Sequence, residues 1–248
     1  MMPALPRLDA LATRVHIVLA AHDAPDVVEA LPVLRAVLSA DEQARELRYR
    51  LPADRVRFVV GRGLARHLLG QVLCLAPAEI AIATEAHGRP VLASHHPHGI
   101  GFNVSHTHGL VAVAITDTRD VGIDVEDTAR AITHDIPSRF FSPAEVHDLH
   151  TLPAAAQASA FFDYWTLKEA YIKARGLGLA IPLDQFSFHL APQETPVLTL
   201  DPRQDDTADR WQFHLASPTT RHRLALAVSR GDTPTRAVRV WWFGARPA

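Results

Sequence analysis

A pattern that occurs twice along the chain limits the fold more than any other feature. The sequence LSADE begins at Leu38 and the similar FSPAE begins at Phe141, and LPA follows each of them. In both, a serine with a glutamate three residues later forms a capping box that starts a helix, and a longer helix and a strand follow. The pattern predicts two halves of similar construction that meet near residues 116–121, with a chance likeness as the alternative.

Composition excludes several classes of protein. The chain has 248 residues, of which 48% are hydrophobic, so it can form one large or two modest domains with real cores. The formal net charge of −2 gives no basic field, and we expect neither a nucleic acid nor a membrane as partner. The single cysteine, Cys74, lies in an apolar run, which predicts a small core residue and excludes an internal disulfide. Because the apolar N-terminal segment is short and interrupted by charges, we expect a cytoplasmic protein.

The segment WTLKEAYIKARGLG, residues 165–178, predicts a helix that ends in glycines. With 3.6 residues per turn, Glu169 and Lys173 lie one turn apart on the same face, while Lys168 points elsewhere. The simplest interpretation of this pair is a surface ion pair worth about 0.2–0.5 kcal/mol. A functional interpretation depends on what the rest of the chain brings to this face.

The first half combines a strand with arginine-rich helices. Arg14 to Ala21 predicts a strand, Pro32 to Val37 a connection, Ser39 the start of a helix and Asp54 the start of another. The helical stretches carry seven arginines: Arg45, Arg48, Arg50, Arg55, Arg57, Arg62 and Arg66. The default interpretation is a solvated face, and the alternative is the lining of a site for an anionic ligand.

A histidine-rich segment follows two short predicted strands joined by a Gly-Arg-Pro turn. Its histidines are His95, His96, His98, His106 and His108. A zinc site is one interpretation, but there is no cysteine pair and no His-Glu-x-x-His helix, so loop histidines are favoured. His106 differs because it directly precedes the strand GLVAVAIT, from whose mouth a side chain can reach a ligand.

Two carboxylates share one face of the next predicted strand, VGIDVED. Side chains alternate along a strand, so Asp124 and Glu126 point one way while Ile123 and Val125 point the other. Neighbouring carboxylates raise one another's pKa unless a cation or donors lie between them. A solvated pair at a sheet edge is one interpretation. A hard-cation site, with Glu169 as a third oxygen ligand, is the other.

Four motifs in this order, FNVSHTHG, GIDVE, FFSPAE and WTLKEAYIKARGLGLAIPLDQF, strongly resemble the Sfp-type 4'-phosphopantetheinyl transferases, and the similarity spans roughly Ser39 to Phe188. The resemblance implies an α+β fold of two similar lobes related by a pseudo-two-fold axis, over residues 1–117 and 118–248, with the active site between them. It implies transfer of the 4'-phosphopantetheine arm of coenzyme A to a serine of an apo acyl or peptidyl carrier protein. This is the reaction of a holo-[acyl-carrier-protein] synthase, and it releases adenosine 3',5'-bisphosphate.

Carried over by position, the resemblance assigns roles to individual side chains. It assigns three carboxylates to Mg²⁺, with Mn²⁺ as the alternative metal: Asp124, Glu126 and Glu169. It assigns six polar or basic residues to coenzyme A: Arg45, Arg89, Ser105, His106, Lys168 and Lys173. Among these, Arg45 would hold the 3'-phosphate and Lys173 the pyrophosphate.

The chain departs from the family pattern at three positions. Glu42 stands where some relatives carry lysine, Phe58 where some carry a nucleotide-binding threonine, and Thr107 where serine is usual. The first two departures leave the full set of 3'-phosphate contacts open.

The implied reaction requires a base for the attacking serine hydroxyl, within hydrogen-bond reach directly or through one water. Glu169 is the first candidate, and Glu145 in FFSPAE is the second. Mg²⁺ would neutralise the pyrophosphate and stabilise the leaving group, and Lys173 would add a point charge.

Other functions and the partners remain to be weighed. A magnesium-dependent phosphohydrolase of nucleotides or coenzyme A would use the same carboxylates, and a catalytically silent carrier-protein binder would keep the same surface. An acidic carrier protein suits a basic patch near the cleft. The family implies polyketide, nonribosomal peptide or fatty acid synthases as clients. Because one chain holds both halves of the site, we expect a monomer.

Overall fold

The computed structural model describes residues 2–96, 99–132, 136–191, 194–231 and 235–247. The first half contains β1 (Arg14–Ala20), α1 (Pro25–Ala36), α2 (Ala40–Arg48), α3 (Pro52–Leu73), the 3-10 turn Pro77–Glu79, β2 (Ile82–Thr84), β3 (Pro90–Leu92), β4 (Gly101–Thr107) and β5 (Leu110–Thr116). The second half begins with β6 (Val121–Asp127), α4 (Ile136–Phe140), α5 (Pro143–Thr151) and α6 (Ala154–Arg175). It continues through the 3-10 turns Gly178–Ala180 and Leu183–Gln185, β7 (Phe186–His189), β8 (Val197–Leu200), the 3-10 turn Ala208–Arg210, β9 (Trp211–Thr219), β10 (His222–Ser229) and β11 (Ala237–Trp242).

The two halves repeat one order of elements, which confirms the α+β construction predicted from the sequence pattern. In each half a nine-residue helix with a capping box, α2 or α5, precedes a 22-residue helix, α3 or α6. A short antiparallel hairpin, β2–β3 or β7–β8, comes next, and a longer antiparallel pair, β4–β5 or β9–β10, ends the repeat. The same order of elements therefore follows both copies of the sequence pattern.

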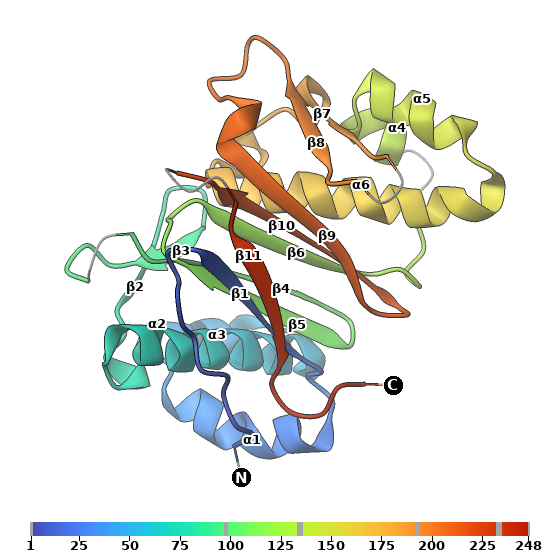
Figure 1. Ribbon diagram of the computed structural model, residues 1–248. Helices are drawn as coiled ribbons and strands as arrows, with labels where there is room; N and C mark the ends of the chain where they lie inside the picture. The colour runs from blue at the N-terminus through green and yellow to red at the C-terminus, as the bar shows by residue number, and fades with distance from the viewer. Residues whose placement is uncertain (1, 97–98, 133–135, 192–193, 232–234, 248) are drawn as a thin grey trace.

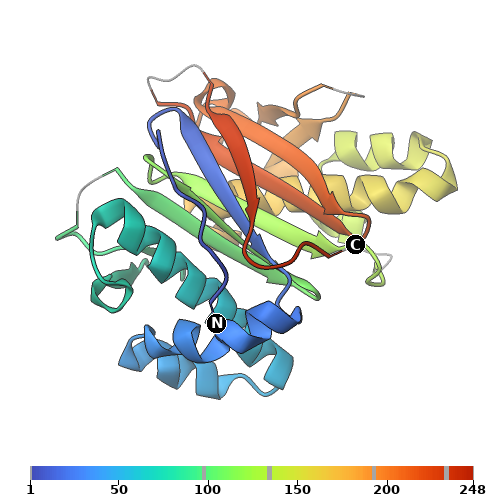
Figure 2. The ribbon, with the colours of Figure 1, turned by 60° about the horizontal axis from the view of Figure 1, so that its bottom comes forward.

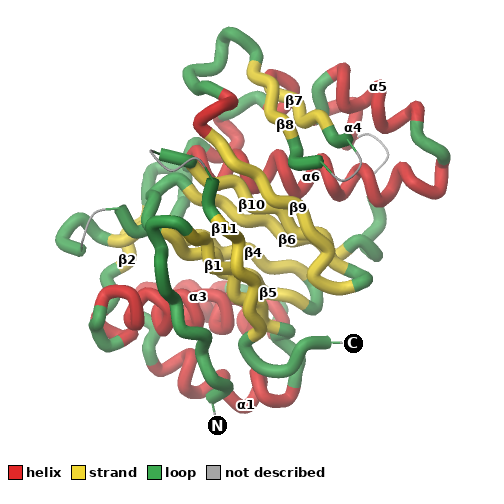
Figure 3. Tube along the Cα trace, viewed as in Figure 1, coloured by secondary structure: helices red, strands yellow, loops and turns green. Residues whose placement is uncertain are grey.

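The strands form a central layer between two groups of helices (Figure 1, Figure 3). One sheet has the order β11-β1-β5-β4 and the other the order β6-β10-β9. Helix α3 lies on the first sheet, with α1 and α2 packed against it, and α6 lies on the second sheet, with α5 packed against α6 (Figure 1). A third apolar cluster lies between the sheets, formed by residues of β1, β5, β6 and β10. Burial of these apolar faces joins the halves into one body.

Polar side chains of β4 join the two sheets where β4 meets β6. Three backbone N–H groups of β6 donate to alternate residues of β4: Ile123 N to Asn103 Oδ1 at 3.0 Å, Val125 N to Ser105 Oγ at 3.3 Å and Asp127 N to Thr107 Oγ1 at 3.1 Å. These bonds satisfy buried donors at an edge where no main-chain ladder forms. We call this contact the β4–β6 seam.

Two expectations for the first half are wrong. Residues 32–36 continue α1 instead of forming a connection, because Val27, Ala30 and Leu34 are fully buried at helical spacing and their packing outweighs the missing N–H of Pro32. Cys74 is exposed and not a core residue. Cys74 is the residue that ends α3, and its backbone is left-handed, with φ of 55°. The chain leaves the helix there, so Cys74 does not continue the buried face of α3.

The last strand of the chain belongs to the first sheet and not to the second. β11 pairs in parallel with β1, so the two ends of the chain lie side by side in the first sheet (Figure 2). Phe243 is fully buried in the first half's core, whereas Trp241 is 37% exposed and stacks on the ring of His16. In the part of the chain that the structure describes, no helix has the length and apolarity needed to cross a membrane.

Candidate functional site

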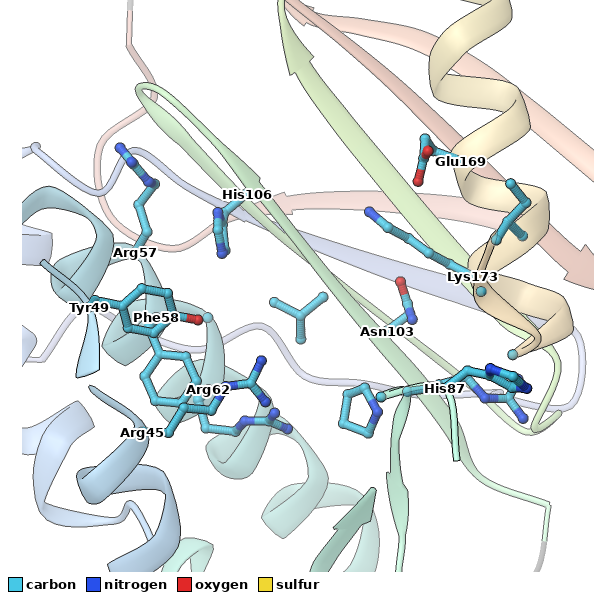
Figure 4. A pocket seen from close by; sticks show the side chains of 18 residues that line it. Arg45, Tyr49, Arg57, Phe58, Arg62, His87, Asn103, His106, Glu169 and Lys173 are labelled. Atoms are coloured by element: carbon cyan, nitrogen blue, oxygen red, sulfur yellow. The ribbon is translucent and has the colours of Figure 1, made fainter. Parts of the chain in front are cut away.

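A cavity of about 320 Å³ opens between the two halves (Figure 4). The first half contributes α2, α3, the turn between β2 and β3, and β4, and the second contributes the end of α6. Gly122 of β6 lets α6 approach, since a Cβ there would collide with the carbonyl oxygen of Ala170. This approach brings Glu169 and Lys173 to the cavity wall, one turn apart as the sequence predicted.

Three carboxylates gather at this end of the cavity. Burial, followed by the charge of Asp124, raises the pKa of Glu126 to about 7. The same two causes raise the pKa of Glu169. Trp165 Nε1 donates to Glu126 Oε1 at 3.1 Å, and Arg130 pairs with the same oxygen at 3.3 Å. The charge of Asp124 acts on both glutamates, and this repulsion marks a place that favours a cation.

Lys173 is the cation now closest to this group. Its Nζ lies 2.6 Å from Asp124 Oδ1, 3.1 Å from Ser105 Oγ and 3.3 Å from the carbonyl oxygen of Ile123. Burial alone would lower the pKa of Lys173, but the charge of Asp124 and its hydrogen bond raise it. Lys173 therefore stays charged beside the carboxylates.

The donor set fits a hard divalent cation. Asp124 Oδ2 is buried and has no hydrogen-bond partner among the described residues, which leaves an acceptor available to a metal. Three carboxylates supply the oxygen ligands that Mg²⁺ prefers. Among the described residues, no three histidine, cysteine, aspartate or glutamate side chains lie close enough together to hold a metal ion as they stand. The other oxygen of Asp124, Oδ1, is paired with Lys173.

His106 lies between the two ends of the cavity (Figure 4). Partial burial in the cavity, followed by the positive charges of Arg57 and Lys173, lowers the pKa of His106. The imidazole is therefore neutral near pH 7 and offers a hydrogen bond to a ligand. His95 and His96 lie elsewhere, with rings 4.4 Å apart, His108 is 3.8 Å from Asp127, and His98 lies outside the described residues.

An aromatic and basic cluster forms the opposite end, across the cavity from Glu169 and Lys173 (Figure 4). The guanidinium carbons of Arg45 and Arg62 lie 5.6 Å and 6.0 Å from the centre of the Phe58 ring, and Tyr49 packs on the same ring. Arginines over an aromatic face form a cationic surface that suits an anionic ligand. Of the seven arginines in this part of the sequence, three line the cavity: Arg45, Arg57 and Arg62.

Arg89 lines the cavity at the junction of the halves. Its Nη1 donates to the carbonyl oxygen of Ala174 at 2.7 Å, and its Nε donates to Glu85 at 2.7 Å. Gly176 ends α6 with φ of 67°, and a Cβ there would lie 2.6 Å from the guanidinium carbon of Arg89. The glycine that ends the helix therefore also admits Arg89.

Five residues predicted for the site do not line the cavity: Asp124, Glu126, Glu145, Lys168 and Ser105. Glu145 and Lys168 form a buried ion pair of 2.8 Å, with side chains 0% and 1% exposed. Ser105 is buried in the β4–β6 seam, where its hydroxyl donates to Asp124 Oδ1 at 3.0 Å. These contacts already occupy Glu145, Lys168 and Ser105, so the structure gives no support to a base role for Glu145 or to direct ligand contacts of Lys168 and Ser105, and these roles stay predictions.

Several cavity residues escaped individual prediction, among them Tyr49, Arg62 and Asn103. Asn103 stands two residues before Ser105, so strand alternation places both on the seam side. Arg62 lies one turn after Phe58 on α3, a spacing that puts the two on one helix face. Helical periodicity could therefore have singled out Arg62 among the arginines.

Comparisons with known proteins cover both halves of the chain. A family model described as "4'-phosphopantetheinyl transferase, N-terminal" matches residues 25–118. A second, described as "4'-phosphopantetheinyl transferase superfamily", matches residues 120–228. Together the two models include every residue of the cavity.

Three curated relatives illustrate the similarity. The chain is 36% identical over 232 residues to 4'-phosphopantetheinyl transferase HetI of Nostoc sp., which covers 92% of this chain and 93% of that one. It is 30% identical over 226 residues to a phosphopantetheinyl transferase of Thraustochytrium sp., with coverage of 84% and 76%. It is 32% identical over 153 residues to 4'-phosphopantetheinyl transferase Sfp of Bacillus subtilis, with coverage of 62% and 66%.

Proposed function

The chain belongs to the 4'-phosphopantetheinyl transferase superfamily, and from that membership we propose that it transfers the 4'-phosphopantetheine arm of coenzyme A to a serine of an apo acyl or peptidyl carrier protein. The products are the holo-carrier and adenosine 3',5'-bisphosphate. The observation that carries the proposal is the division of one cavity into a carboxylate and lysine end and an arginine end. Coenzyme A also has two separate anionic groups, a pyrophosphate and a 3'-phosphate.

The carboxylates would hold the metal ion. Asp124, Glu126 and Glu169 would bind Mg²⁺, or Mn²⁺ as the alternative, and the unpaired Asp124 Oδ2 supports this assignment. When bound, the ion neutralises the pyrophosphate and stabilises the leaving group.

Lys173 and His106 would position the pyrophosphate. The Nζ of Lys173, now bonded to Asp124, would exchange that oxygen for one of phosphate, so its charge stays paired. His106 would donate a hydrogen bond from the middle of the cavity. Arg45 would bind the 3'-phosphate at the opposite end, and Arg89 would hold the turn between β2 and β3 in place.

Transfer requires one bond to form and one to break. The serine oxygen bonds to the β-phosphorus of coenzyme A, and the bond from this phosphorus to the bridging oxygen breaks. The bridging oxygen leaves on adenosine 3',5'-bisphosphate. Glu169 lines the cavity and accepts the hydroxyl proton directly or through one water, whereas Glu145 is held by its ion pair and cannot reach it.

The same proposal covers partner, oligomeric state and location. The acceptor is an acidic carrier protein whose serine reaches the pyrophosphate beside Glu169, and basic side chains near the cavity would speed the encounter. Residues of one chain supply both ends of the cavity, which supports a monomer, and size exclusion with light scattering tests this. The proposed location is the cytoplasm, which fractionation of expressing cells tests.

The decisive experiment is intact-mass spectrometry of an apo carrier protein incubated with this protein and coenzyme A, with Mg²⁺ and then with chelator. We expect a mass gain of one phosphopantetheine arm that chelator abolishes. Hydrolysis of coenzyme A without a mass gain would indicate a phosphohydrolase instead. Neither hydrolysis nor gain over a panel of acyl and peptidyl carriers would indicate a silent binder.

A further inference from the structure

Two histidines bind the main chain of the turn between β4 and β5. The turn consists of His108 and Gly109. The N–H of Gly109 donates to His22 Nε2 at 3.0 Å, and the carbonyl oxygen of His108 lies 2.8 Å from His222 Nε2. His22 follows β1 in the first half, whereas His222 begins β10 in the second half. We call His22 and His222 the histidine clamp.

The partners of the histidine clamp determine where each ring carries its proton. A backbone N–H can only donate, so His22 Nε2 has no proton and the neutral ring carries it on Nδ1. A carbonyl oxygen can only accept, so His222 Nε2 carries a proton. The other nitrogen of His222 lies 2.7 Å from the hydroxyl of Thr219, which can donate or accept. Protonation of His22 therefore breaks its bond to the turn, whereas His222 keeps both of its bonds in either charge state.

The surroundings of His22 keep it neutral near pH 7. The side chain is 7% exposed. Burial lowers the pKa of His22, the neighbouring Asp23 opposes this, and the charges of Arg57 on α3 and His108 in the turn lower the pKa further. Arg57 is itself paired with Asp54. Both bonds of the histidine clamp are therefore present near neutral pH, and the bond of His22 is lost below about pH 6.5.

The turn also faces a carboxylate of the second half. His108 Nδ1 lies 3.8 Å from Asp127 Oδ2, and a proton on His108 would strengthen this contact. Arg221 binds both oxygens of Asp127 at 2.6 Å and holds the pKa of that carboxyl below its usual range, so the charge persists in acid. Acid thus weakens the attachment of the turn to the first half and strengthens its attachment to the second.

The turn is close in sequence to a predicted ligand contact. His106 lies on β4 two residues before His108, and its ring is exposed in the cavity, so the main chain of β4 determines its place. Arg57, which also lines the cavity, acts on the pKa of both His22 and His106. Release of Gly109 therefore acts on the end of β4 that carries His106.

We propose that His22 is a positioning residue for coenzyme A binding: its neutral ring holds the β4–β5 turn, and with it His106, in the arrangement that binds the pyrophosphate, and a proton releases the turn. The inference rests on the proposed function, which supplies coenzyme A as the ligand and His106 as its contact. His22 does not line the cavity, so it acts through the turn and not by touching the ligand.

The test measures the KM for coenzyme A and kcat between about pH 8 and 5.5. It compares the wild-type protein with His22→Gln, His22→Leu and His189→Gln. Glutamine offers an oxygen near the place of Nε2 and takes up no proton in this range, whereas leucine offers no acceptor. His189 is an exposed histidine of β7 that does not line the cavity, so its loss controls for the removal of one imidazole. His106 titrates in all of these proteins, so the differences between them report on His22.

One neutral hydrogen bond corresponds to about 2- to 10-fold in binding. We expect His22→Leu to raise the KM by this factor already near pH 8, with kcat unchanged. As the pH falls, the KM of the wild-type protein and of His189→Gln should rise above that of His22→Gln by the same factor. Equal KM curves for the wild type and His22→Gln would overturn the inference. If the leucine variant does not fold, this comparison carries the test alone.

Nuclear magnetic resonance tests the histidine clamp without the transfer reaction. Long-range ¹H–¹⁵N spectra should show the Nδ1–H form of His22 and a proton on His222 Nε2, and the amide resonance of Gly109 should follow the titration of His22 in the wild type but not in His22→Gln. The opposite form of His22, or a Gly109 resonance that ignores pH, would refute the clamp. Carrier modification by the wild-type protein is measured in parallel: its absence refutes the proposed function, whereas a normal rate with equal KM curves refutes only this inference.

Discussion

The buried pair of Glu145 and Lys168 allows a quantitative test of what these residues do. Lys168 Nζ also donates to the carbonyl oxygens of Leu183 and Phe186, both at 2.7 Å, and Glu145 accepts from the N–H groups of Ser142 and Phe188 at 2.9 Å and 2.8 Å. The pair thus joins α5, α6 and β7 through groups that are all satisfied. Removing one partner leaves the other as an unpaired buried charge.

We expect Lys168→Met and Glu145→Gln each to reduce the free energy of unfolding by about 3–5 kcal/mol. For a chain of this size, each kcal/mol corresponds to about 2–4 °C, so the melting temperature falls by roughly 6–20 °C. The double variant no longer contains an unpaired charge, although two carbonyl groups lose their donor. Its loss should therefore be smaller than the sum of the two single losses, by about 0.5–3 kcal/mol.

Urea unfolding followed by circular dichroism measures these differences, and transfer rates are measured well below each melting temperature. Additive losses, or a Glu145→Gln variant as stable as the wild type, would refute the ion-pair argument. A folded Glu145→Gln variant that has lost all transfer activity would instead restore Glu145 as a candidate base.

Three further predictions concern the site and its supports. Glu169→Gln should abolish transfer while coenzyme A binding stays measurable by calorimetry, and wild-type rates would exclude both the metal and the base role. Gly176→Ala should lower the free energy of unfolding by about 1–2 kcal/mol, because alanine disfavours the left-handed backbone, and thermal melting measures this loss. The added methyl group should also displace Arg89 and raise the KM for coenzyme A, which steady-state rates measure. His22 Nε2 accepts a hydrogen bond from Gly109 N at 3.0 Å, and burial lowers the pKa of His22 in the folded protein. The imidazole therefore binds a proton more tightly in the unfolded chain, and the free energy of unfolding falls as the pH drops below about 6.5. His22→Gln should therefore flatten the dependence of unfolding free energy on pH between 5 and 7, and identical curves would contradict the assignment.

Local patterns predicted the parts of the molecule that local forces determine. Both capping boxes, at Ser39 and Ser142, form as expected, and α6 ends at Gly176. Helical and strand periodicity correctly placed Glu169 with Lys173 and separated Asp124 from its apolar neighbours. In each case the determining interactions lie within a few residues of sequence.

Long-range packing determined what the sequence could not predict. The FFSPAE motif contains Glu145, but only the approach of Lys168 from α6 reveals that the carboxylate is buried and paired. β11 pairs with β1 across almost the whole length of the chain, and no local signal distinguishes that partner from β10. Arg62 differs from the exposed Arg48 only through Glu42 and the cavity, both of which depend on the contact between α2 and α3.

The β4–β6 seam explains why only one of two adjacent predicted ligands reaches the cavity. Alternation along β4 turns Asn103, Ser105 and Thr107 towards the N–H groups of β6, and it turns Val104 and His106 to the other side, where both line the cavity. Of the three seam residues, only Asn103 also reaches the cavity wall. Ser105 and His106 therefore cannot share one role. The hydroxyl of Ser105 bonds Asp124, Lys173 and the N–H of Val125 together, so the contact that joins the halves also fixes the carboxylate and lysine end of the site. His106 lies on the opposite face of the same strand. The seam therefore determines its distance from the carboxylate and lysine end, and no separate loop is needed to position it.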